Sequence, residues 1–127
     1  MQDYMLIDDD SVINFLHKEL ISIVNPLANV REFQSSKQAL LWFADQANQQ
    51  SVNDAIVFLD INMPEMNGFE FLDSLNNLDL SVLEGKCKIV MVTSSLNDKD
   101  KELALSYKLV SNYMEKPLTM EYLSSLS

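Results

Sequence analysis

The sequence predicts an α/β domain with a five-stranded parallel sheet in the order 2-1-3-4-5, doubly wound and covered by five helices. Two observations predict it. Short apolar runs bounded by turn signals alternate five times with segments of helical periodicity, without a linker or repeat. Right-handed crossovers then leave few topologies for such a chain, and this strand order is the simplest. At 127 residues the chain is expected to form one domain spanning 1–127.

The strands are predicted from runs of apolar and β-branched residues that are short enough to be buried in a parallel sheet. The fourth run begins with Cys87, the only cysteine, which we expect to be a small buried residue in a reducing compartment. The predicted strands are Tyr4–Ile7, Val30–Gln34, Ala55–Leu59, Cys87–Val92 and Asn112–Met114.

The helices are predicted from apolar spacing and from polar residues that cap helix starts. The first covers Ser11–Val24, and His17 is expected to be exposed on it. The second begins at Ser35 or Ser36, the third near Gly68, and the fourth covers Asp98–Lys108, while Thr119 caps a short last helix. The apolar stripes of four of them are Val12, Leu16, Leu20 and Ile23; Ala39, Leu40, Phe43 and Ala47; Phe69, Leu72 and Leu75; and Met120, Leu123 and Leu126.

Composition narrows the classes of function. The net charge is −10, from 19 acidic and 9 basic residues, which opposes binding to nucleic acid and to anionic membranes. No apolar stretch reaches the roughly 20 residues of a membrane span, and no signal peptide is visible, so we expect a soluble, cytoplasmic protein. Only two glycines occur, too few for a glycine-rich phosphate loop. Side chains and a metal ion would therefore have to bind any phosphate.

Acidic residues follow two of the predicted strands. Asp8-Asp9-Asp10 follows the first strand and Asp60 follows the third. In the predicted order these strands are neighbours at the switch point, where ligands bind in open α/β sheets. Thr93 ends the fourth strand and Lys116 follows the fifth, so the same edge also collects a hydroxyl and an ammonium group.

Converging carboxylates repel one another unless a cation compensates, and Mg²⁺ prefers such oxygen ligands. Zn²⁺ is disfavoured because His17 is the only histidine and no ligand spacing exists. A carboxylate can also attack phosphorus, and Asp60, which stands singly, is the better nucleophile. Asp8 and Asp9 would hold the metal, while Lys116 and the Thr93 hydroxyl, or neighbouring N–H groups, could bind the remaining phosphoryl oxygen.

These residues resemble the receiver domain of two-component response regulators, in particular its stand-alone, chemotaxis-regulator-like members. The resemblance rests on Asp8-Asp9, Asp60-x-x-Met-Pro-x-Met-x-Gly68, Thr93 and Lys116-Pro117, and it spans Tyr4 to about Leu126. It implies the flavodoxin-like fold and phosphoryl transfer with Mg²⁺ from a sensor histidine kinase or phosphotransfer protein to Asp60. It also implies metal binding by Asp9, Asp60 and the Asn62 backbone carbonyl, with Asp8 acting largely through metal-bound water.

The resemblance further implies a switch in which Thr93 moves toward the phosphate and the aromatic ring of Tyr113 turns inward. The surface of the fourth predicted helix, the fifth strand and the last helix would then change for an unknown partner protein. The protein would not be an enzyme acting on other substrates, since it would catalyse only its own phosphoryl transfer and dephosphorylation. Ser95 and Asn62 occupy positions that influence dephosphorylation rate in the family, so the phosphate lifetime stays open.

Other interpretations of the same residues remain. Asp8-Asp9-Asp10-Ser11-Val12 fits the opening motif of haloacid dehalogenase-type phosphatases, with Asp8 as nucleophile and Asp10 as acid–base. A degenerate receiver that only binds a partner is a third possibility. Simpler structural roles also exist: Asp8, Asp9 or Asp10 could cap the first helix, and the segment up to Gly68 could be a turn with a positive φ at that glycine.

Overall fold

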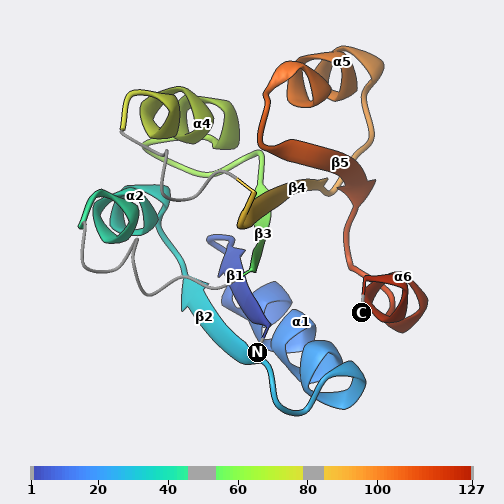
Figure 1. Cartoon of the computed structure of the whole chain (residues 1–127). Coiled ribbons are helices and arrows are strands. Elements are labelled where there is room, and N and C mark those ends of the chain that lie inside the picture. Colours follow the sequence, from blue (N-terminus) through green and yellow to red (C-terminus); the bar gives the residue numbers. More distant parts are fainter. Residues whose placement is uncertain (1, 46–53, 79–84, 127) are drawn as a thin grey trace.

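Five parallel strands form one sheet in the order β2-β1-β3-β4-β5 (Figure 1). The computed structural model describes residues 2–45, 54–78 and 85–126. Predicted residue Ala47 of the second helix lies outside the described residues. The fold predicted from the sequence is confirmed, with five helices in the described ranges.

The strands begin and end close to the predicted residues, and β1, β3 and β4 are runs of mostly buried apolar side chains. The largest difference is the fifth strand, which extends beyond the predicted Asn112–Met114 in both directions. A register irregularity at Ile89 and Val90 accompanies this pairing of the fourth and fifth strands. The strands are β1 Asp3–Ile7, β2 Asn29–Phe33, β3 Ala55–Asp60, β4 Cys87–Thr93 and β5 Val110–Glu115.

Each helix begins after a polar residue whose side chain accepts hydrogen bonds from free N–H groups of the first turn. These N-caps are Asp10, Ser35, Asn67, Asn97 and Thr119. The fourth predicted helix ends two residues before Lys108, because the backbone is extended at its C-cap Tyr107. The helices are α1 Ser11–Val24, α2 Ser36–Ala44, α4 Gly68–Asn76, α5 Asp98–Ser106 and α6 Met120–Ser125.

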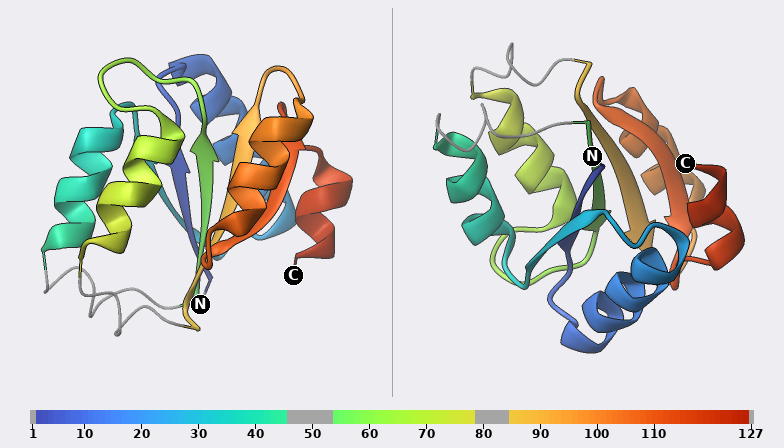
Figure 2. Two further views of the ribbon diagram at one scale, coloured as in Figure 1. Left: turned by 90° about the horizontal axis from the view of Figure 1, so that it is seen from above. Right: turned by 60° about the horizontal axis from the view of Figure 1, so that its bottom comes forward.

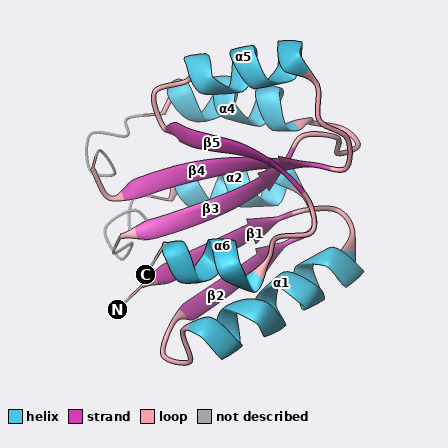
Figure 3. Cartoon of the chain, turned by 90° about the vertical axis from the view of Figure 1, so that its right-hand side faces the viewer, coloured by secondary structure: helices cyan, strands magenta, loops and turns pink. Residues whose placement is uncertain are grey.

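The sheet is covered on both faces, so the domain has three layers (Figures 2 and 3). Alternate residues of β1 show the division, because Met5 and Ile7 point to one face while Tyr4 and Leu6 point to the other. The first face packs against α2, α4 and α5, and the second against α1 and α6. Every residue of the central strands β1 and β3 is buried, so packing on both faces determines where the carboxyl ends of these strands lie.

Helix α1 packs against the sheet with a different face from the one predicted. Its apolar stripe is largely exposed, with Val12 at 70% and Ile23 at 62% of their accessible area. The buried residues of this helix are instead Asn14, His17 and Ile21. The expectation that His17 is exposed is therefore wrong, because this ring is 2% accessible. Periodicity alone could not choose between the two faces, since polar side chains occupy the buried one.

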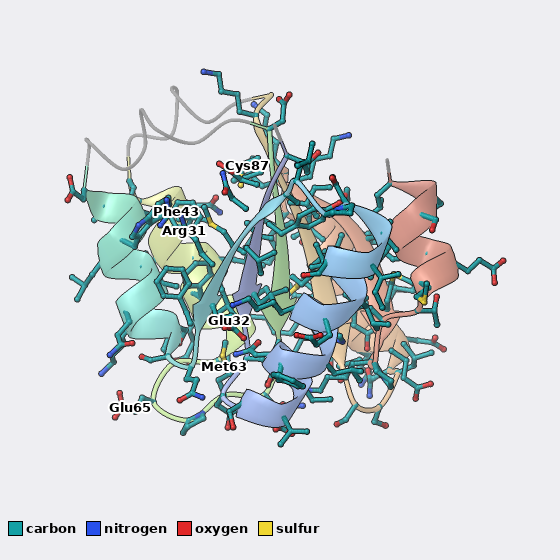
Figure 4. All side chains as sticks on the ribbon, turned by 90° about the horizontal axis from the view of Figure 1, so that it is seen from below. Arg31, Glu32, Phe43, Met63, Glu65 and Cys87 are labelled. Atoms are coloured by element: carbon teal, nitrogen blue, oxygen red, sulfur yellow. The ribbon has the colours of Figure 1, made fainter. Side chains whose placement is uncertain are left out.

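The two ends of the sheet differ in character. Cys87 begins β4 and is buried, as predicted, at the opposite end from the loop that contains Met63 and Glu65 (Figure 4). Burial raises the pKa of the Cys87 thiol to about 12, so it stays protonated and unreactive at neutral pH. In the described parts of the chain, no helix is both long and apolar enough to cross a lipid bilayer.

Candidate functional site

Three carboxylates converge at the carboxyl ends of β1 and β3. Asp8 and Asp9 follow Ile7, the last residue of β1, and Ile7 lies beside Leu59 in the sheet. Asp60 is the next residue of β3. One carboxylate oxygen from each of the three aspartates lies within 4.8 Å of the other two. Asp8 and Asp60 are buried, whereas Asp9 is exposed. The predicted convergence of the two acidic segments is present in the structure.

Asp8 and Asp10 have different local roles. The Asp8 backbone N–H donates to Phe33 O at 3.0 Å, which ties the end of β1 to β2. One carboxylate oxygen of Asp8 accepts from the Asp10 N–H at 2.9 Å. The Asp10 side chain accepts from the N–H groups of Val12 and Ile13 and so caps α1. Asp10 is thus the N-cap of α1, as the simpler interpretation predicted.

Lys116 brings the only ammonium group among the described residues that pairs with these carboxylates. Its Nζ donates to Asp8 Oδ2 at 2.8 Å and lies 3.2 Å from Asp60 Oδ1. Its backbone N–H donates to Thr93 O at 2.8 Å, and the Lys116–Pro117 bond is cis. Burial alone would lower the pKa of Lys116, but hydrogen bonds to and charges of Asp8 and Asp60 raise it, so the group is charged.

Asp60 is the most perturbed carboxyl group of the site. Burial and then the neighbouring Asp8 charge raise its pKa to about 6. The Lys116 ammonium and the Asn62 backbone N–H, which donates to the Asp60 carboxylate, act in the opposite direction. Asp60 is therefore mostly ionised at pH 7, but it is held at an energetic cost that a cation or a proton would relieve.

The loop after β3 approaches Asp60 closely. Gly68 begins α4, and a Cβ atom placed on it would lie 2.6 Å from the Asp60 backbone O and 3.0 Å from Ile61 Cα. Glycine is needed here for this close approach, and the positive φ considered for Gly68 is wrong. The left-handed residue of the loop is Glu65, at φ 68°. Asn62 is exposed beside Asp60, and metal binding by its carbonyl stays a prediction.

Thr93 and Tyr113 both lie near this edge, but they contact the loop after β4. The Thr93 hydroxyl donates to Ser95 O at 3.1 Å and accepts from the Ser95 N–H. The Tyr113 ring is buried, and its hydroxyl accepts from the Asn97 N–H at 2.9 Å, at the start of α5. Both hydroxyls are therefore bonded to the loop after β4, and the switch that the resemblance implies for Thr93 and Tyr113 stays a prediction.

Sequence reasoning missed two buried polar residues of α1. The Asn14 Nδ2 donates to Asp8 O at 2.9 Å, and the His17 Nε2 accepts from the Leu118 N–H at 3.0 Å. In the described parts of the chain, the Asn14 Oδ1 is buried without a hydrogen-bond partner. A signal did exist, because Asn14, His17 and Ile21 share one face by their three- and four-residue spacing. Because two of these three residues are polar, the sequence analysis assigned this face of the helix to solvent.

The fold and the site define a doubly wound α/β domain with an acidic, lysine-containing site at its topological switch point. A family model described as the response regulator receiver domain matches residues 4–126. The chain belongs to this family, the receiver domains of two-component response regulators. Membership implies phosphorylation-dependent signalling.

Individual relatives agree with the family. The nitrate/nitrite response regulator protein NarL of Escherichia coli (strain K12) is 32% identical over 101 residues, which cover 80% of this chain and 42% of that protein. The chain thus spans less than half the length of this curated relative.

Solved structures give the same picture. A response regulator receiver protein from Dyadobacter fermentans DSM 18053 has a TM-score of 0.86 at 25% identity, covering 99% of this chain and 94% of that chain. A two component response regulator from Cytophaga hutchinsonii has a TM-score of 0.82 at 28% identity, covering 99% and 93%. The chemotaxis protein CheY4 of Vibrio cholerae, at 21% identity, a TM-score of 0.77 and coverage of 99% and 95%, shares the fold.

The donor set fits Mg²⁺, which receiver domains bind in general. Asp8, Asp9 and Asp60 offer carboxylate oxygens, the hard ligands that this ion prefers, within the spacing of one site. Their three negative charges are offset by the single ammonium of Lys116, so a divalent cation would complete the compensation.

Proposed function

We propose that this chain is a phosphorylation-activated switch in which Asp60 accepts a phosphoryl group from a sensor histidine kinase or phosphotransfer protein. The observation that carries the proposal is the Lys116 ammonium, which lies within 3.2 Å of the Asp60 carboxylate and 2.8 Å of Asp8. An ammonium beside a nucleophilic carboxylate is placed to bind a phosphoryl oxygen once the phosphorus is bonded to Asp60.

Asp9 and Asp60 would bind Mg²⁺ directly, together with the Asn62 backbone carbonyl, and Asp8 would act largely through metal-bound water. When bound, Mg²⁺ would neutralise charge on the phosphoryl oxygens and on the carboxylates. The buried Asp8 side chain is already oriented for such a role by the Asp10 N–H and by Lys116.

The proposed transfer is a displacement at phosphorus. One carboxylate oxygen of Asp60 forms a bond to phosphorus while the P–N bond to the imidazole of the donor histidine breaks. The electron pair of the breaking bond stays on that imidazole nitrogen. The product is an acyl phosphate on Asp60, and attack of water on its phosphorus later returns the free carboxylate and inorganic phosphate. We propose that the chain catalyses only these two reactions on itself.

Phosphorylation would change the contacts of Thr93. Its hydroxyl now donates to Ser95 O, and a phosphoryl oxygen at Asp60 would be a stronger, charged acceptor. Exchange of that partner would move the loop that also contains Asn97, which the Tyr113 hydroxyl holds at the start of α5. The surface of α5, β5 and α6 would thereby change for a downstream partner protein.

This output surface has the exposed apolar side chains that a protein partner requires. Leu103 and Leu105 of α5 and Met120 of α6 are each exposed over more than two fifths of their area. The net charge of −10 favours a protein partner over nucleic acid or an anionic membrane.

Substitution of Asp60 tests the proposal. With Mg²⁺ and a small acyl-phosphate donor, the wild-type protein should gain the mass of one phosphoryl group, and base should remove it. Asp60→Asn should show no such gain, because an amide is not a nucleophile toward phosphorus. Glu102→Gln, which removes an exposed charge on α5, is the matched control and should be phosphorylated normally. Equal phosphorylation of Asp60→Asn and wild type would refute the assignment.

A further inference from the structure

His17 occupies an unusual place for the only histidine of the chain. It lies in the middle of α1 on the face that packs against the sheet, and its ring is 2% accessible. Asp8 and Lys116, the ion pair of the site, are close enough to influence the charge of this ring. A buried imidazole costs free energy unless it is hydrogen-bonded, so its partner indicates what the residue does.

That partner is the backbone of the segment after β5. The His17 Nε2 accepts from the Leu118 N–H at 3.0 Å, and both residues are buried although they are 101 positions apart. A ring nitrogen that accepts is unprotonated, so the neutral ring carries its proton on Nδ1. Burial lowers the pKa of His17 to about 4, which keeps Nε2 an acceptor at neutral pH.

The segment that donates this hydrogen bond to His17 also contains Lys116. On one side, the Lys116 N–H donates to Thr93 O at the end of β4. The next residue, Pro117, has no N–H, so Leu118 is the next backbone donor. The segment is thus attached to β4 before the proline and to α1 after it. Between these two attachments, the Lys116 ammonium reaches Asp8 and Asp60.

We propose that His17 is a positioning residue for phosphoryl transfer, which holds Lys116 between Asp8 and Asp60 by binding the Leu118 N–H. This inference rests on the proposed function for its chemical consequence, but the placement of Lys116 can be measured without any phosphorylation. His17 does not touch the reacting atoms and acts through the backbone of residues 116–118.

Three variants separate positioning from simple packing. His17→Leu keeps an apolar side chain in the core but cannot accept from Leu118. His17→Gln offers an amide oxygen at about the distance of Nε2 and should rescue the bond. Ile21→Ala, one turn further along the same buried face, loosens the packing of α1 without removing the bond, and so is the matched control. Thermal unfolding shows which variants are folded at the temperature of measurement.

The first readout uses nuclear magnetic resonance on the unphosphorylated protein. In His17→Leu the Leu118 amide should exchange its hydrogen at least about tenfold faster than in Ile21→Ala, because only the former loses the acceptor. The Lys116 Nζ signal should shift toward that of an exposed lysine. His17→Gln should restore both signals. Equal exchange rates and an unmoved Lys116 signal in His17→Leu would overturn the proposal.

The second readout is phosphorylation by a small acyl-phosphate donor at saturating concentration. The rate constant of His17→Leu should fall about tenfold, because a misplaced ammonium stabilises the transferring group poorly, while His17→Gln and Ile21→Ala stay near wild type. If His17→Leu and Ile21→Ala react at the same rate, His17 only packs. If the wild type gains no phosphoryl group, the proposed function fails, and the Lys116 signal still decides whether His17 positions that lysine.

Discussion

Helices α1 and α4 stand in equivalent places, because each follows a strand with a carboxylate of the site at or just after its last residue. Their buried faces differ. Helix α4 buries Phe71, Leu72 and Leu75, whereas α1 buries Asn14 and His17 beside Ile21. The apolar face of α4 contributes packing energy, while the polar residues of α1 hold backbone groups by hydrogen bonds: Asn14 holds Asp8 O and His17 holds the Leu118 N–H.

The comparison indicates that stability and site geometry are supported from different sides of the sheet. On the α4 side, apolar burial supplies free energy and Gly68 lets the helix start come close to Asp60. On the α1 side, hydrogen bonds determine where the backbones of the aspartate pair and the lysine lie. Apolar side chains of α1 are left on the surface, where Val12 and Phe15 are 70% and 63% exposed.

The largest effect on stability is expected from the apolar helix. Leu72→Ala should lower the free energy of unfolding by about 3 kcal/mol, because Leu72 is buried in α4 and its truncation leaves a cavity. In the protein that remains folded, the rate of Asp60 phosphorylation by a small donor should be unchanged. Urea unfolding measures the loss of stability, and the phosphorylation assay measures the rate. A large loss of rate without loss of stability would break the proposed division between the two helices.

Gly68→Ala should affect both stability and chemistry. The added Cβ would lie 2.6 Å from the Asp60 backbone O, so the start of α4 or the end of β3 must move. We expect a loss of about 2 kcal/mol of stability, as for overpacked cores, and slower phosphorylation of Asp60. Asn76→Ala, at the other end of the same helix, controls for changes in helix propensity. Wild-type stability in Gly68→Ala would show that the contact is not restrictive.

The exposed apolar side of α1 is expected to matter only with a protein donor. Phe15 is 63% exposed in the first half of α1, the helix that follows Asp8 and Asp9, and we expect a protein donor to approach Asp60 over this end of the sheet. Phe15→Ser should reduce phosphotransfer from a protein donor about tenfold, which is typical of an aromatic interface residue, but leave phosphorylation by a small acyl phosphate unchanged. Leu103→Ser on α5 is the control, with a similarly exposed apolar side chain on the other face of the sheet. Equal loss with both donors would contradict a docking role.

The smallest expected effect concerns how the free energy of unfolding depends on pH, to which Asp60 and His17 should contribute in opposite directions. The pKa of Asp60 is raised from 3.8 to about 6, so its contribution to stability is present at low pH and is lost as the pH rises through about 6. The pKa of His17 is lowered from 6.5 to about 4, so its contribution is present above pH 6.5 and is lost as the pH falls through about 4.

Substitution of Asp60 and substitution of His17 should therefore change the pH dependence of the free energy of unfolding in opposite directions. Relative to wild type and without Mg²⁺, Asp60→Asn should become more stable by about 1 kcal/mol as the pH rises from about 5 to 6. Over the same range His17→Gln should gain relative to wild type as the pH falls. Urea unfolding in the presence of a metal chelator measures both curves. Parallel curves for the two variants would show that the two groups do not oppose each other.

Much of the fold could be predicted because its signals are local. Buried strands such as Ala55–Asp60 are short apolar runs, and capping residues such as Ser35 and Thr119 mark the starts of helices. The convergence of Asp8, Asp9 and Asp60 could also be predicted, since strand order alone brings the ends of β1 and β3 together. The buried face of α1 could not, because hydrophobic periodicity assigned the wrong side of that helix to the core.

The sequence by itself determined the order of the strands, the acidic edge of the sheet and the family, because these follow from apolar runs and from residues at fixed spacing. Only the tertiary structure decided that His17 faces inward, that it accepts a hydrogen bond from the Leu118 N–H, and that the Thr93 hydroxyl is hydrogen-bonded to the backbone of Ser95. Each of these contacts joins a side chain to a backbone group through folded geometry. A hydrogen bond over 101 positions leaves no periodicity in the chain, so folding must bring its two partners together before it can be seen.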